Sequence, residues 1–154
     1  MTNALIPSLL VVRPHWRRWV WAICVPLFTL ACTSDDTHIS ISGLNYTDQT
    51  VGAFAVNGHG GGGLMPQDGG GGFVCCVTVP RRWRPGLHVT VSWTGDHNSA
   101  APWKEQVVRV PEYKESEIGF MAVHFYPSGD VKVLVTAITV GHPDYPYPKP
   151  KKGG

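Results

Sequence analysis

The chain has 154 residues, of which 16% are charged, and a formal net charge of +2 at pH 7. Residues 1–31 hold three Arg and no acidic residue, so the rest keeps 10 of the 13 Lys and Arg against 11 Asp and Glu, a net charge of −1. This balance argues against a nucleic-acid-binding protein, which would carry a basic surface. The remaining residues, about 120, suffice for one domain with one core.

The N-terminal segment has the parts of an export signal. Arg13, Arg17 and Arg18 form a positive block before an uncharged run of thirteen residues, 19–31. A helix needs about 20 residues to cross a hydrocarbon core, so this run has the length of a signal-peptide apolar region instead. The alternatives are a short transmembrane anchor and a plain secretory signal.

Residues 29–32, Thr-Leu-Ala-Cys, resemble the lipobox of bacterial lipoproteins, in which the cysteine is acylated and the chain is cut before it. We therefore expect a signal peptide over residues 1–31 and a lipidated tether over residues 32–37, with lipid on Cys32. Thr33 follows the cysteine, where Asp is the inner-membrane retention signal of enterobacterial lipoproteins. The resemblance implies a protein on the periplasmic face of the outer membrane.

Short apolar or alternating runs follow one another along the mature chain, and no long helix is indicated. Residues 112–117 are charged and predict at most one helical turn, and Pro127–Asp130 predicts a hairpin turn. The expected fold is all-β, a small antiparallel β-sandwich, immunoglobulin-like in outline, over residues 38–140. The expected strands are 38–42, 51–56, 73–79, 87–93, 104–110, 118–126 and 131–140.

A long glycine-rich segment separates the second and third expected strands. Residues 58–72 include nine glycines, which predicts a long flexible loop. Its letters His59-Gly-Gly-Gly match an oxyanion-hole motif, and Gly58–Gly63 matches a dinucleotide-binding motif. Both motifs lack their context, because no Gly-x-Ser-x-Gly and no following amphipathic helix occur. A metal site made by His59 with Asp68 is a further, minor alternative.

Two adjacent cysteines, Cys75 and Cys76, lie in the third expected strand. Neighbouring residues of a strand point to opposite faces, which favours two separate thiols. A vicinal disulfide is the second alternative, since the periplasm is oxidising, and an intermolecular bridge or a metal role is the third.

The C-terminal residues 141–154 are rich in Pro and Lys. Such a composition favours extended polyproline II conformation without packing. We expect a disordered tail here.

The turn Arg81-Arg-Trp-Arg84 is the densest surface feature of the sequence. Arg and Trp are enriched at the energetic centres of protein interfaces. We predict partner contacts through Arg81, Arg82, Trp83 and Arg84, together with His59 and Met65 of the glycine-rich loop. The alternative is an ordinary exposed turn whose Trp83 packs on the sheet edge.

Several short motifs together resemble a family of proteobacterial lipoproteins built on a domain of unknown function. They span roughly residues 38–138 and are Gly-Leu-Asn-Tyr-Thr-Asp (43–48), Val-Asn-Gly (56–58), the glycine run into Cys75-Cys76, Val-Pro-Arg-Arg-Trp-Arg-Pro-Gly-Leu (79–87), Val-Ser-Trp (91–93), Val-His-Phe-Tyr (123–126) and Gly-Asp-Val (129–131). Some members look like immunity proteins encoded beside phospholipase effectors of type VI secretion systems.

The resemblance implies a periplasmic, lipid-anchored binding protein that neutralises a phospholipase toxin, with the toxin and the membrane as its partners. It carries over no catalytic residue, and from the residues themselves we expect no enzyme activity, no metal and no cofactor. The alternative function is a structural or assembly lipoprotein of the cell envelope.

Overall fold

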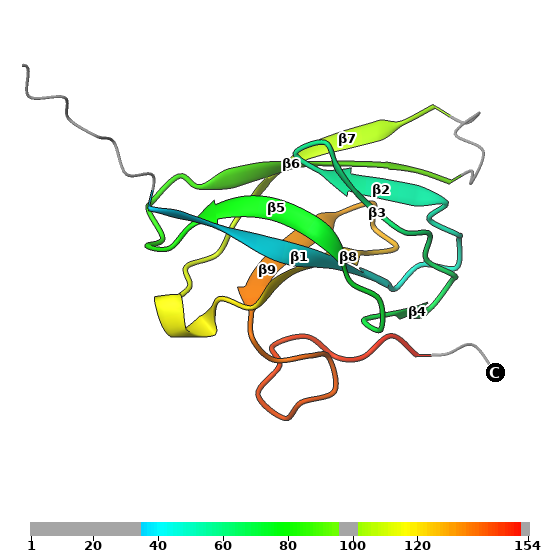
Figure 1. Ribbon diagram of the computed structural model, residues 1–154. Helices are drawn as coiled ribbons and strands as arrows, with labels where there is room; N and C mark the ends of the chain where they lie inside the picture. The colour runs from blue at the N-terminus through cyan, green and yellow to red at the C-terminus, as the bar shows by residue number, and fades with distance from the viewer. Residues whose placement is uncertain (1–34, 96–101, 152–154) are drawn as a thin grey trace, which may run out of the picture. The chain divides into compact units, whose positions relative to one another are not determined.

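The computed structural model describes residues 35–95 and 102–151, which form two β-sheets (Figure 1). The predicted signal peptide and the lipidated Cys32 lie outside the described residues. Sheet I contains β1 (Asp36–Asn45), β4 (Asp68–Gly69), β5 (Val74–Pro80), β8 (Phe120–Phe125) and β9 (Val131–Thr136). Sheet II contains β2 (Ala53–Val56), β3 (His59–Gly61), β6 (His88–Thr94) and β7 (Lys104–Arg109).

Strand β1 organises sheet I. Its first half pairs with β5 and its end pairs with β4, both antiparallel, while β8 runs parallel to it on the other edge. Strand β9 continues the sheet beyond β8. The strand is longer than the expected range 38–42, because Gly43-Leu-Asn45 continues the ladder with β8. The antiparallel prediction therefore holds for every pair of named strands except β1–β8.

The two sheets pack face to face, and their alternating apolar residues form the core. In β6, Val89 and Val91 are buried while His88 is exposed, as the alternation predicts. The same period places Ile39 and Ile41 of β1 inside. The predicted all-β sandwich is thus confirmed. The predicted helical turn is a 3-10 turn at Glu115–Glu117.

The outer face of sheet I is covered by the C-terminal segment, which runs beneath that sheet in Figure 1. All six residues of β8 are buried, so this strand is covered on both faces. Tyr145 is 7% exposed and packs with Leu44 and Phe120 in a second apolar cluster. The expectation of an unpacked tail is therefore wrong for Tyr145 and Tyr147, because these tyrosines between the prolines supply apolar surface to bury.

The glycine-rich segment is more ordered than expected of one long loop. Within residues 58–72, β3 forms a hairpin with β2, and β4 pairs with the end of β1. Gly69 needs its φ of +131°, and a Cβ there would lie 2.3 Å from the Gly43 carbonyl oxygen. The glycines at this point allow a close backbone approach that no other residue permits.

Candidate functional site

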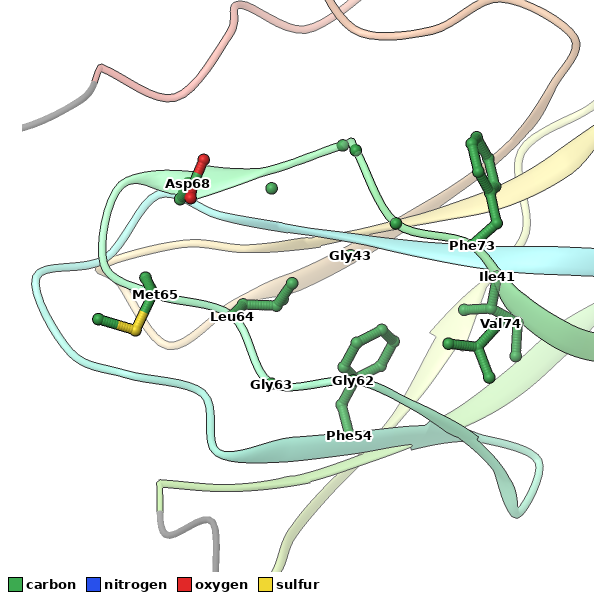
Figure 2. A pocket seen from close by; sticks show the side chains of 14 residues that line it. Ile41, Gly43, Phe54, Gly62, Gly63, Leu64, Met65, Asp68, Phe73 and Val74 are labelled. Atoms are coloured by element: carbon green, nitrogen blue, oxygen red, sulfur yellow. The ribbon is translucent and has the colours of Figure 1, made fainter.

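A hollow of about 360 Å³ opens at the edge of the sandwich beside the glycine-rich segment (Figure 2). Its floor is made by Ile41 of β1 and Phe54 of β2, both buried. Leu64 and Met65 come from the stretch between β3 and β4, and Phe73 comes from just before β5. The glycines 62–63 and 69–72 complete the wall.

Two glycines make room for the floor of this hollow. A Cβ at Gly43 would lie 2.6 Å from Leu64 and 2.9 Å from Phe54, and one at Gly61 would lie 2.1 Å from the Phe54 ring. Real Cβ atoms do not approach so closely, so both positions require glycine if Phe54 is to stay in place. The glycine content is therefore partly a packing requirement.

The rim of the hollow exposes large apolar side chains. Met65 is 62% exposed, Phe73 52% and Val74 39%. Asp68 is the one polar side chain among the lining residues. The lining residues other than Asp68 include no nucleophile and no base. The arrangement of apolar side chains suits contact with an apolar surface.

Cys75 and Cys76 adjoin this rim at the beginning of β5, and their sulfur atoms are joined as a disulfide. Of the three alternatives that the sequence left open, the structure contains the second, a vicinal disulfide between Cys75 and Cys76. The favoured interpretation, two separate thiols on opposite faces, does not describe it.

The arginine turn, residues 81–84, lies at the other end of β5. Arg81 approaches Glu115 at 3.7 Å, and Arg82 approaches Asp35 at 3.8 Å. The Trp83 indole N–H donates to the Val110 carbonyl oxygen at 3.1 Å, and its ring packs against the core. Trp83 thus fastens the turn to the sheet.

The predicted partner-binding residues therefore fall into separate groups. Met65 lines the hollow, whereas His59 is exposed on β3 and does not line it. The arginine turn follows Pro80, which pairs with Asp36, while the hollow adjoins β4, which pairs with Leu44. On β1 the hollow begins at Ile41, five residues beyond Asp36, which is about 17 Å at the usual rise.

A buried cluster of tyrosines around His124 was missed by the sequence analysis. His124 is fully buried on the outer face of sheet I, and its Nε2 lies 2.8 Å from the Tyr145 hydroxyl. The Tyr147 ring packs on it with centroids 4.6 Å apart. Burial lowers the pKa of His124 to about 4, since a charged imidazole would lose its hydration.

Further contacts hold the same segment down. The Tyr46 hydroxyl donates to the Pro148 carbonyl oxygen at 2.8 Å, and Lys132 lies over the rings of Tyr126 and Tyr147. Burial raises the pKa of Tyr46 and Tyr145. The run Phe120–Phe125 could have revealed this cluster, because it is apolar or aromatic at nearly every position. Such a strand is expected to be buried on both faces of its sheet.

Two features are absent from the described ranges, 35–95 and 102–151. No three His, Cys, Asp or Glu side chains in them gather closely enough to hold a metal ion. No helix among those residues is long and apolar enough to cross a membrane.

The fold and the hollow define a small β-sandwich with an exposed apolar rim. Residues 44–133 match the family described as "Protein of unknown function (DUF3304)", and the chain belongs to that family. No curated protein and no solved structure matches the chain. The predicted membership of a family built on a domain of unknown function is confirmed.

Proposed function

We propose that this protein is a lipid-anchored immunity factor on the periplasmic face of the outer membrane, which binds and neutralises a phospholipase toxin of a type VI secretion system. The observation that carries the binding role is the exposed apolar rim of the hollow, made by Met65, Phe73 and Val74. Exposed apolar side chains that gather around a concave site mark interaction surfaces.

The chemistry of the rim complements that of the proposed partner. A phospholipase must present apolar surface at its active-site mouth, because it takes acyl chains from a lipid layer. An apolar rim that covers this mouth buries both surfaces and blocks access of the substrate. The glycines at positions 62, 71 and 72 support the same role, since a Cβ there would meet open space and the partner can approach the backbone.

An affinity experiment tests this proposal. Tagged residues 33–154 are mixed with an extract that contains the native secreted effectors, and bound proteins are identified by mass spectrometry. We expect a stoichiometric phospholipase whose activity on vesicles falls when the bait is added. The double variant Met65→Asp/Phe73→Asp is expected to weaken the complex 100-fold or more, on the order of 3 kcal/mol for two interface anchors.

The matched control is Val107→Asp on β7. Val107 is 65% exposed, close to the 62% of Met65, but belongs to sheet II and does not line the hollow. It should bind like the wild type. Equal weakening by both variants would contradict the assignment of the hollow, and recovery of only cell-wall or outer-membrane proteins would favour a structural envelope role.

A further inference from the structure

The arginine turn lies beside the residue at which the described chain begins. The Arg81 backbone N–H donates to the Asp35 carbonyl oxygen at 2.7 Å, and Arg82 Nε lies 3.8 Å from an Asp35 carboxylate oxygen. Figure 1 shows the start of β1 and the end of β5 at the same end of the domain. The turn is thus fixed next to the N-terminal end of β1.

Covalent geometry limits how far this end can be from a lipid on Cys32. Two residues, Thr33 and Ser34, separate Cys32 from Asp35, so three Cα–Cα steps join them, and an extended chain spans at most about 3.6 Å per step. The two Cα atoms therefore lie within about 11 Å of each other. If Cys32 is lipidated, as the proposed function requires, the arginine turn is held close to the bilayer surface.

The turn presents guanidinium groups that are free to bind there. The Arg82 side chain is 87% exposed, and its contact with Asp35 is long and exposed, so it contributes little. Arg84 is exposed, and among the described residues it has no ion pair. Guanidinium groups donate two parallel hydrogen bonds to phosphate oxygens. The hydrogen bond from Trp83 to Val110 keeps the turn in place.

The attraction is local, because acidic groups share this end of the domain. Asp35 directly precedes β1, Asp36 begins it, and Glu115 lies beside Arg81. These acidic groups prevent a broad positive field, so the attraction comes from contacts of individual arginines with individual phosphates.

We infer that Arg82 and Arg84 bind the headgroup phosphates of the phospholipids in which the protein is anchored, and so hold β1 upright on the membrane. The hollow, which begins at Ile41 about 17 Å further along β1, then faces away from the bilayer. This inference rests on the lipid anchor of the proposed function. It divides the sequence-predicted contact residues between two partners: the arginines contact the membrane, and Met65 contacts the toxin.

Fluorescence quenching on vesicles tests the orientation. The lipidated protein is reconstituted in phosphatidylethanolamine and phosphatidylglycerol vesicles that contain a nitroxide-headgroup lipid, with a fluorophore on Pro85→Cys or on Met65→Cys. Both positions are exposed, and Cys75 and Cys76 are bonded to each other and so do not take the label. We expect quenching at position 85 to exceed that at position 65 several-fold.

A charge-reversal variant tests the role of the arginines. Arg82→Glu/Arg84→Glu should remove most of the difference between the two labels. Lys149→Glu/Lys151→Glu is the control, because it makes the same change of charge on exposed residues of the C-terminal segment and should leave the difference intact. Equal quenching at both labels in the wild type, or an unchanged difference in the arginine variant, would overturn the inference.

Two further readouts separate this inference from the proposed function. The intact mass of the protein shows whether acyl chains are present. Without acyl chains, both the lipid anchor and the inference are refuted. With acyl chains, equal quenching at positions 85 and 65 refutes the inference alone. Lipid-free protein with Arg82→Glu/Arg84→Glu should bind the toxin with the wild-type affinity. A tenfold or greater loss there would assign the arginines to the toxin instead.

Discussion

Of two apolar surfaces of this domain, one is covered by another segment of the chain and the other is exposed to solvent. The outer face of sheet I is sealed by the C-terminal segment, and Leu44 and Tyr145 there are 1% and 7% exposed. The rim of the hollow has no such cover, and Met65 and Phe73 are more than half exposed. Both surfaces come from residues that a sequence pattern classes simply as apolar.

The difference shows which apolar surface is available to a partner. Side chains of the C-terminal segment cover one face, namely Ile138, Val140, Tyr145 and Tyr147. The chain builds the other surface from glycine backbone, which leaves the side chains of the rim in solvent. The exposed rim of the hollow is therefore a better candidate for binding a partner than the covered outer face of sheet I.

The largest expected effect concerns the backbone that supports the open surface. Gly69→Ala places a Cβ 2.3 Å from the Gly43 carbonyl oxygen and forces a φ of +131° on alanine, so we expect a loss of about 4 kcal/mol in the free energy of unfolding. Chemical denaturation measures it. Gly71→Ala, where a Cβ meets nothing within 4 Å, should cost about 1 kcal/mol or less, and equal losses would contradict the assigned role of Gly69.

The sealed face should respond to pH. The folded pKa of His124, about 4, lies below its ordinary value of 6.5, so the unfolded chain binds more protons between these values. Stability is fully present above pH 6.5 and is lost as the pH falls toward 4, by up to about 3 kcal/mol. Unfolding midpoints measured from pH 7 to 4 test this, and His124→Gln should flatten the dependence. Parallel losses in both proteins would assign it to other groups.

A smaller effect is expected when one hydroxyl of the seal is removed. Tyr145→Phe leaves His124 Nε2 without its partner in a buried site and should cost about 1–2 kcal/mol. Tyr46→Phe is the matched change, because its hydroxyl reaches the Pro148 carbonyl oxygen in an exposed position and should cost about 0.5 kcal/mol. Thermal unfolding compares the two variants. A larger loss of stability in Tyr46→Phe would mean that Tyr46, and not Tyr145, is the main contact that holds the C-terminal segment on sheet I.

The smallest expected effect on stability comes from the rim itself. Met65→Ser changes a side chain that is 62% exposed, so the free energy of unfolding should stay within about 0.5 kcal/mol of the wild type. A larger loss in chemical denaturation would show that Met65 supports the fold, and the contrast between an open and a sealed surface would then weaken.

The sequence analysis succeeded where the pattern is local. The alternation of Leu87–Trp93 predicted β6 because a strand exposes its two faces in turn. It named Met65 as a contact residue because of the long glycine-rich segment; the structure places Met65 on the rim of the hollow, and its contact with a partner stays a prediction. It missed β3 and β4, since glycine-rich runs carry no strand propensity, and it left the bond between Cys75 and Cys76 open.

By itself the sequence determined the β-sandwich class and the order of its main strands, because a two-residue period records burial on one face. Only the tertiary structure decided the rest. Tyr145 packs because β8 presents His124 to it, and Gly61 stays glycine because Phe54 lies across the hairpin. The arginine turn and the hollow are separated because they lie at opposite ends of β5, where Val74 pairs with Ile41 and Pro80 pairs with Asp36. Each of these facts depends on a partner distant in the chain, which no local pattern records.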